Sequence, residues 1–222
     1  MKLVHSNMER QLMWTEQQEC EWIIESPILF SSYVRELREQ IEGKEGKFVL
    51  SKNEDILDIS KSVDIITDPL NFNINDKKIL SKIYADLSVA AYEEDTYLKT
   101  QEVLGNLKSY FLELEQKNLI MLDLDDEIDM QALFKTLGVH ISEAEDDFFE
   151  NLNTYLKVSS ILLKRKLIVF INVRSYISDE QLNEILNNAI YNEIRILFIE
   201  NMQRSCPDRI KQYIIDNTGC EI

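Results

Sequence analysis

The sequence has few of the residues that flexible linkers and disulfide frameworks require. Its 222 residues include only five glycines and three prolines, which leaves little material for a long flexible linker. The three cysteines, Cys20, Cys206 and Cys220, are widely separated and form no CxxC pair. This spacing favours reduced thiols in a cytoplasm over a disulfide framework or a zinc site.

Long apolar runs and a secretory signal are missing as well. The longest apolar stretches have the length of a strand, which is too short to cross a membrane. No apolar run follows the first lysine, so the N-terminal segment does not have the pattern of a secretory signal. We therefore expect a cytoplasmic protein that has no membrane partner.

The balance of charge is strongly acidic, with a formal net charge of −16 at pH 7. A field of this sign repels phosphates, so composition alone argues against nucleic-acid binding. A nucleic-acid function would need a basic strip that persists on this background, or cations that change the sign of the charge locally. The apolar fraction of 45% is enough for one large core or two modest ones.

The motifs of common nucleotide-dependent and hydrolytic enzymes are absent. Neither Gly43-Lys44 nor Gly46-Lys47 has a glycine five residues upstream or a Ser or Thr after its lysine, so the chain lacks a P-loop. His5 and His140 have no local nucleophile and orienting group that would form a triad. Glu200 ends an apolar run as the acidic residue of a Walker-B strand does, but a polar residue at the end of a buried strand is ordinary.

The second half of the sequence predicts an α/β fold. Apolar runs of strand length at residues 167–172 and 194–200 flank an amphipathic helix that begins with a capping box at Ser178. Strands that are apolar throughout, separated by a helix, predict a parallel pair buried on both faces. A further helix is expected over residues 143–163.

The middle of the chain has a helical pattern, after short predicted strands at residues 48–50 and 63–67. Two amphipathic helices are expected, with apolar positions at Leu80, Ile83, Tyr84 and Leu87 and at Leu104, Leu107, Phe111 and Leu114. We expect an antiparallel hairpin whose apolar stripe joins an intramolecular core, with a partner surface as the alternative. The predicted architecture is therefore an α/β head domain with a mostly parallel sheet, residues 1–69 and 138–222, and an inserted α-helical leg domain, residues 70–137.

An acidic run at residues 123–129 has the composition of a metal site. Its first four carboxylates belong to Asp123, Asp125, Asp126 and Glu127. Calcium takes roughly six to eight oxygen ligands in flexible geometry. The run is not an EF-hand loop, because Ile128 replaces the turn glycine and Phe134 stands at the twelfth position. The residues alone favour a solvated acidic loop over an irregular divalent site completed by Glu113 or Glu115.

Basic residues that could contact phosphates gather at three places. The candidates are Lys77, Lys78 and Lys82 at the start of the first leg helix, Lys135, and the cluster of Lys164, Arg165 and Lys166. This cluster also suits the C-terminal end of the preceding helix, where cations meet the negative end of the helix dipole. No basic stripe is interleaved with aromatic residues, so stacking of single-stranded bases is not indicated.

Several short segments, taken together, resemble a known family. In this order, residues 65–75 (IITDPLNFNIN), 80–87, 133–139 (LFKTLGV), 163–172 (LKRKLIVFIN) and 195–200 (RILFIE) are similar to segments of the accessory protein family of type II-A CRISPR adaptation. The similarity covers about residues 63–200. The first 60 residues resemble the family poorly.

The resemblance implies both an architecture and a role. Family members form homotetrameric rings of subunits whose head is related to P-loop ATPases but lacks the catalytic loop. A non-catalytic protein is implied, which binds double-stranded DNA ends without sequence specificity in a basic central hole. Its implied role is spacer acquisition, together with the CRISPR integrase and effector nuclease of the same locus. Calcium is implied near the junction of head and leg, which points to Asp123, Asp125, Asp126 and Glu127 as its ligands.

Two functions of other classes stay open on the sequence. One is a metal-dependent nuclease or phosphohydrolase whose carboxylates are Asp123, Asp125 and Glu200, which would have to converge on the metal ions. The other is a structural protein–protein adaptor that uses the apolar stripe of the leg as its working surface.

Overall fold

The chain forms two compact units in the computed structural model, which describes residues 1–144 and 147–222. The head contains residues 1–74 and 143–222, and the leg contains residues 75–142. The boundaries expected from the sequence, 70 and 137, lie a few residues before these. Among the described residues, no helix combines the length and the apolar character that a bilayer crossing requires.

Five parallel strands form the main sheet of the head, in the order β6-β7-β8-β3-β9. Their bounds are β3 Glu19–Ile24, β6 Val63–Ile66, β7 Leu167–Ile171, β8 Arg195–Glu200 and β9 Ile210–Ile215. All of β7 is buried, as its continuous apolar run predicts. β7 and β8 pair in parallel with Leu167 opposite Arg195, so the predicted strand–helix–strand unit is confirmed.

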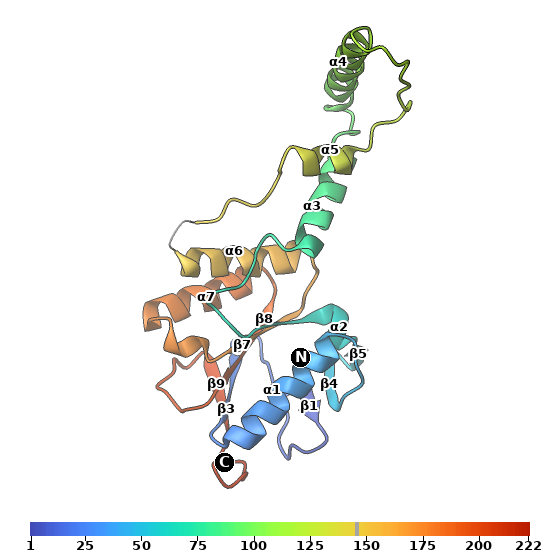
Figure 1. Cartoon of the computed structure of the whole chain (residues 1–222). Helices are drawn as coiled ribbons and strands as arrows, with labels where there is room; N and C mark the ends of the chain where they lie inside the picture. The colour runs from blue at the N-terminus through green and yellow to red at the C-terminus, as the bar shows by residue number, and fades with distance from the viewer. Residues whose placement is uncertain (145–146) are drawn as a thin grey trace. The chain divides into compact units, whose positions relative to one another are not determined.

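Two helices, α6 (Phe148–Ile161) and α7 (Asp179–Tyr191), lie side by side over one face of this sheet (Figure 1). α7 begins with the predicted capping box. The Ser178 hydroxyl accepts from the Gln181 N–H, and the Gln181 side chain accepts from the Ser178 N–H. α6 begins later than predicted, because Asp147 caps it. Part of the expected N-terminal extension, residues 145 and 146, lies outside the described residues.

The other face of the sheet packs against α1 (Pro27–Ile41) and a small antiparallel sheet of order β2-β1-β4-β5. The bounds of its strands are β1 Lys2–His5, β2 Leu12–Met13, β4 Phe48–Lys52 and β5 Asp55–Leu57, and α2 (Ile59–Ser62) follows them. Aromatic rings connect these layers. The rings of Trp22 in β3 and Tyr33 in α1 have centroids 4.9 Å apart. The main hydrophobic core of the head lies on this side.

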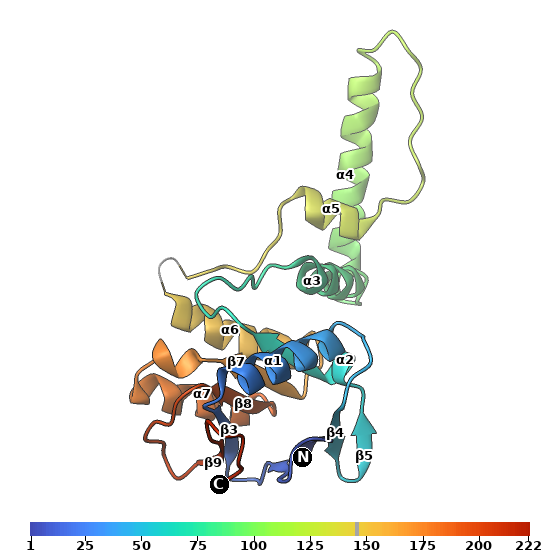
Figure 2. The ribbon, with the colours of Figure 1, turned by 60° about the horizontal axis from the view of Figure 1, so that its bottom comes forward.

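The leg contains α3 (Lys77–Ala90), α4 (Tyr97–Glu115) and α5 (Met130–Thr136). The predicted antiparallel hairpin of α3 and α4 is wrong, because α3 packs against α5. Figure 2 shows α3 nearly end-on while α4 is seen from the side. The returning chain takes the place of the expected hairpin partner. Tyr84 of α3 donates to the Val139 carbonyl at 2.8 Å, and the Asn75 side chain exchanges two hydrogen bonds with the backbone of Ile141.

Candidate functional site

Four of the predicted DNA-binding lysines lie in the leg, and all four are exposed. They are Lys77, Lys78 and Lys82 on α3 and Lys135 on α5. Asp76 caps α3 by accepting from the N–H groups of Lys78 and Ile79 at 2.7 and 2.8 Å. Lys77 and Lys78 therefore stand in the first helical turn. There the positive end of the helix dipole disfavours cations and attracts anions.

These four ammonium groups have no carboxylate in ion-pair contact within the described part of the chain. Because α3 and α5 pack together, Lys135 belongs to the same substructure as the lysines of α3. The leg of this acidic protein therefore carries four exposed lysines that are not engaged in ion pairs.

The basic cluster of the head does not act as one surface. Lys164 and Lys166 are exposed, whereas Arg165 is only 5% exposed. Arg165 Nη1 donates to the Ser60 carbonyl at 2.7 Å, and its Nε lies 3.7 Å from Asp64 Oδ2. The guanidinium is used inside the head and reaches a phosphate only by breaking these contacts. This placement corrects the assignment of Arg165 to a DNA-binding surface.

The four predicted calcium ligands lie in the loop between α4 and α5, and all are exposed. Asp123 Oδ1 accepts from the Leu124 N–H at 2.9 Å. In the part of the chain that the structure describes, no three side chains of Asp, Glu, His or Cys are grouped so that they could hold a metal ion. In this conformation the loop does not bring together the several oxygens that a calcium ion needs.

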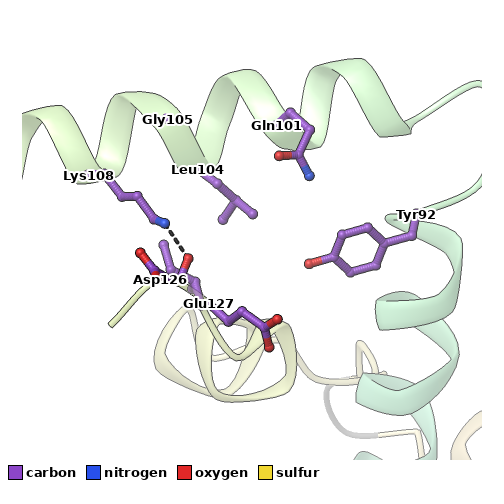
Figure 3. A pocket seen from close by; sticks show the side chains of 8 residues that line it. Tyr92, Gln101, Leu104, Gly105, Lys108, Asp126 and Glu127 are labelled. Carbon is purple, nitrogen blue, oxygen red and sulfur yellow. Dashed lines mark hydrogen bonds between the residues drawn. The ribbon is translucent and has the colours of Figure 1, made fainter. Parts of the chain in front are cut away.

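This loop and α4 border a pocket of about 510 Å³ within the leg. Figure 3 shows Tyr92, Gln101 and Glu127 pointing toward the same space. Lys108 of α4 reaches across and donates from Nζ to the main-chain carbonyl of Asp126. The leg thus supplies a cation of its own to the acidic loop, which offsets part of the charge that a bound metal would offset.

α4 carries an exposed apolar stripe, which we call the α4 stripe. Its members are Val103, Leu107, Tyr110 and Leu114, with exposed fractions of 52, 42, 58 and 44%. Their 4-3-4 spacing is that of the a and d positions of a coiled coil. The stripe expected from the sequence contained Leu104 and Phe111 instead of Val103 and Tyr110. Of that expected stripe, Leu104 alone is buried.

In the head, Arg174 lies between two buried carboxylates, those of Glu21 and Glu200. Arg174 Nη1 donates to Glu21 Oε1 at 2.8 Å, and the Arg174 N–H donates to Glu200 Oε1 at 3.1 Å. Burial raises the pKa of Glu200 to about 7, with the Arg174 N–H opposing this rise and the Glu21 charge adding to it. Since Glu200 has 0% exposure, its carboxylate is not open to a phosphodiester, which argues against the nuclease hypothesis.

Two cations that the sequence analysis did not single out, Lys52 and Arg195, line a pocket of the head together with Lys166. Arg195 lies beside Lys166 because β7 and β8 pair in register, and Lys52 ends a strand of the other sheet. No local pattern groups three residues so far apart in the chain.

Residues 40–218 match the family model described as CRISPR-associated protein (Cas_Csn2). The chain is 30% identical over 152 residues to CRISPR-associated protein Csn2 of Enterococcus faecalis, with 68% of each chain covered. It is 28% identical over 155 residues to CRISPR-associated protein Csn2 of Streptococcus agalactiae, with 68% of this chain and 67% of the relative covered.

Among solved structures, the ATP-binding cassette of an ABC transporter matches with a TM-score of 0.48 and 12% identity, covering 100% of this chain and 89% of that one. A putative ABC transporter ATP-binding protein from Pyrococcus furiosus matches with a TM-score of 0.39 and 10% identity, covering 96% and 97%. These values are too low for any inference about activity. The family model covers most of the chain, and this match confirms the resemblance drawn from the sequence. The protein therefore belongs to the CRISPR-associated Cas_Csn2 family and acts in a CRISPR system.

Proposed function

We propose that the protein is a non-catalytic binder of double-stranded DNA ends, which works in spacer acquisition in the cytoplasm. The placement of Lys77 and Lys78 carries this proposal. Both are exposed and form no ion pair within the described residues, and they stand in the first turn of α3, where the positive end of the helix dipole also attracts an anion. Membership of a CRISPR-associated family supports nucleic acid as the source of that anion.

Binding of this kind is expected to be indifferent to sequence. A lysine ammonium acts on phosphate as a point charge, and phosphate contacts carry no direct sequence information. Lys82 and Lys135 add two exposed cations to the leg, and Lys164 and Lys166 are exposed candidates on the head. The affinity should therefore fall steeply as salt rises, because each phosphate contact releases condensed counterions.

The homotetrameric ring is part of the proposal, and the α4 stripe supports it. A helix whose apolar residues are exposed at coiled-coil spacing is suited to pack against a second copy of itself. Symmetric assembly would place the lysine groups of several subunits around one duplex, so that acidic outer surfaces and a basic inner surface coexist.

Calcium stays a proposal that rests on the family resemblance. Asp123, Asp125, Asp126 and Glu127 do not form a closed site in this structure, so calcium dependence has to be measured rather than inferred from the loop. Contacts with the CRISPR integrase and effector nuclease follow from the proposed role and are proposed with it.

The test is size-exclusion chromatography with light scattering, run in calcium and in EGTA, with linear or closed-circular duplex of one sequence. We expect a tetramer that retains linear DNA but not circular DNA, with EGTA weakening both assembly and binding. Equal retention of the two DNA forms would remove the end-binding proposal, and a monomer without affinity for DNA would remove the proposed function as a whole. If EGTA leaves assembly unchanged, only the proposed dependence on calcium is contradicted.

The adaptor alternative has one observation in its favour, since the α4 stripe is also a surface on which a different protein could pack. The same chromatography distinguishes the two functions. A chain that stays monomeric with the stripe free and does not bind DNA would favour the adaptor.

A further inference from the structure

A pocket in the head gathers positive charge at the amino ends of two central strands. Its volume is about 310 Å³, within the lower range of small-molecule sites. Three cationic side chains line it, those of Lys52, Lys166 and Arg195. Such a concentration is unexpected on a protein whose formal net charge is −16.

The fold brings these three residues together from distant parts of the sequence. Lys166 precedes β7 and Arg195 opens β8, and the Arg195 N–H donates to the Lys166 carbonyl at 2.9 Å. Lys52 ends β4 at a two-residue hairpin turn, in which Asn53 and Glu54 both have positive φ, 51° and 74°. Two positive φ values are the mark of a type I′ turn, which matches the twist of its strands. The turn sets Lys52 and Asn53 at the rim of the pocket.

Arg195 is held in place by a buried carboxylate. Glu19 is 4% exposed, and its Oε1 accepts from Arg195 Nη1 at 2.9 Å. Its Oε2 accepts from the Ile196 N–H at 2.8 Å. Within the described residues, the bond to Glu19 Oε1 is the only hydrogen bond that the Arg195 side chain forms, so its other N–H donors stay available. A guanidinium with one edge fixed and donors left over is prepared to bind a planar or tetrahedral oxyanion.

The rest of the pocket wall includes the buried ring of Trp14 and the carboxylate of Glu16. The indole N–H of Trp14 donates to the Ile196 carbonyl at 2.7 Å, which fixes this ring. Lys52 and Lys166 form no ion pair with any carboxylate of the described chain. Glu16, which is exposed, also lines the pocket and reduces its positive potential.

We infer that this pocket binds a terminal phosphate, a phosphomonoester group with close to two negative charges. Two lysines without an ion pair and the remaining N–H donors of Arg195, whose charge Glu19 partly offsets, match a dianion better than the single charge of an internal phosphodiester. A terminal phosphate also projects from its molecule and enters a concave site, whereas internal phosphates line the outside of a duplex. Free phosphate compounds and the 5′ end of DNA share this chemistry. The DNA-end version rests on the proposed function, and binding of free phosphate does not.

The first experiment titrates inorganic phosphate into the full-length protein at low ionic strength, with isothermal titration calorimetry as the readout. Lys52→Glu and Lys166→Glu should each weaken binding by about tenfold or more, because a charged hydrogen bond is replaced by repulsion. Lys157→Glu, an exposed lysine of α6 outside the pocket, changes the net charge equally and should leave the affinity unchanged. No measurable phosphate binding, or equal losses in all three variants, would overturn the inference.

A second variant tests the sign of the site. Glu16→Gln removes the opposing carboxylate and should strengthen phosphate binding by about two- to fivefold. Because this residue is exposed, the variant is expected to fold normally. Weaker phosphate binding by Glu16→Gln would contradict an anion site.

The third comparison identifies the source of the phosphate. Linear duplexes of one sequence, with 5′-phosphate or 5′-hydroxyl ends, are bound to the unmodified protein and to Lys166→Glu. A preference for 5′-phosphate that Lys166→Glu abolishes assigns the pocket to DNA ends. Equal binding of both duplexes, together with phosphate binding that depends on Lys52 and Lys166, assigns it to free phosphate compounds. Absence of any duplex binding would contradict the proposed function and the assignment to DNA ends, while the binding of free phosphate is judged by the titration.

Discussion

The head and the leg treat apolar side chains in opposite ways. In the head, β7 and β8 bury all their large apolar residues, and the helices over them bury most of theirs. In the leg, Ile79 and Leu104 are the buried apolar residues among those described, while the α4 stripe is exposed. The head therefore has its core within one chain. The leg lacks a comparable core, so its stability and function are expected to depend on something that packs against it.

The largest effect is expected from breaking the α4 stripe. Leu107→Glu places a charge in the middle of the proposed helix interface, and burying it would cost about 3 kcal/mol or more. We expect the tetramer to dissociate, as measured by light scattering over a range of concentrations. The matched control is Ile28→Glu on α1 of the head, where an 81% exposed apolar residue is replaced. If both variants stay tetrameric, the stripe is not the interface.

The next effect should fall on the head alone. Arg165→Ala leaves the Ser60 carbonyl without its donor and the Asp64 carboxylate without its neighbouring cation, so we expect about 2 kcal/mol less free energy of unfolding. Urea denaturation, followed by a spectroscopic signal of the head, measures this free energy. Lys164→Ala, an exposed neighbour, should change this value by less than about 0.5 kcal/mol. A loss of DNA affinity in Arg165→Ala without any loss of stability would restore Arg165 to the interface.

The third effect is on DNA binding by the leg, with no change expected in the free energy of unfolding. Replacing Lys77, Lys78 and Lys82 by Ala should weaken duplex binding by about ten- to a hundredfold and reduce the slope of log affinity against log salt by about 2 to 3. Fluorescence anisotropy at several salt concentrations measures both quantities. The control replaces Lys44, Lys61 and Lys157 of the head, which removes the same charge. Equal losses in both triple variants would mean that only net charge matters.

The smallest effect concerns the pH dependence of the head. The folded-state pKa of Glu200, about 7, lies above its ordinary value of 4.5. The folded state is therefore penalised as pH rises through 7, and the penalty is absent at acidic pH. Glu200→Gln should be more stable than the unmodified protein by about 1–2 kcal/mol at pH 8.5, with little difference at pH 5.

Thermal unfolding across this pH range provides the measurement. The groups that act on Glu200 are Glu21 from β3, Arg174 after β7 and Arg204 after β8. Glu150→Gln, an exposed carboxylate at the start of α6, serves as a control for the loss of one charge. Parallel pH profiles for the unmodified protein and Glu200→Gln would show that the carboxylate carries no such penalty.

The parts of the fold that the sequence predicts are those specified by local signals. The capping box of Ser178 and Gln181 and the apolar runs of β7 and β8 need no distant partner to be recognised. The central strand β3 is missed because Glu19 and Glu21 interrupt its apolar pattern. Their partners, Arg195 and Arg174, lie 176 and 153 residues further along the chain. Buried carboxylates with such remote partners give no local signal.

In the candidate site, too, the sequence predicts features set by local context and misses those that depend on remote residues. Exposure of Lys77 and Lys78 agrees with their sequence context, whereas the burial of Arg165 depends on the Ser60 carbonyl and on Asp64, both remote in sequence. The hairpin of α3 and α4 is wrong because apolar periodicity shows which face of a helix is buried but not which element covers it. The pocket of Lys52, Lys166 and Arg195 depends on strand register, which a linear pattern does not reveal.

The position of β3 in its sheet has a consequence for how the chain is made. β3 pairs with β8 on one side and β9 on the other, so the middle of the sheet needs residues 19–24 and residues 195–215 together. A chain on the ribosome that has reached Ser142 holds β3 without either neighbour, while the whole leg has already been synthesised. Such long-range pairing folds slowly and leaves both edges of β3 without a partner strand during translation. Folding factors that bind nascent chains are expected to act on the N-terminal part of the head and not on the leg.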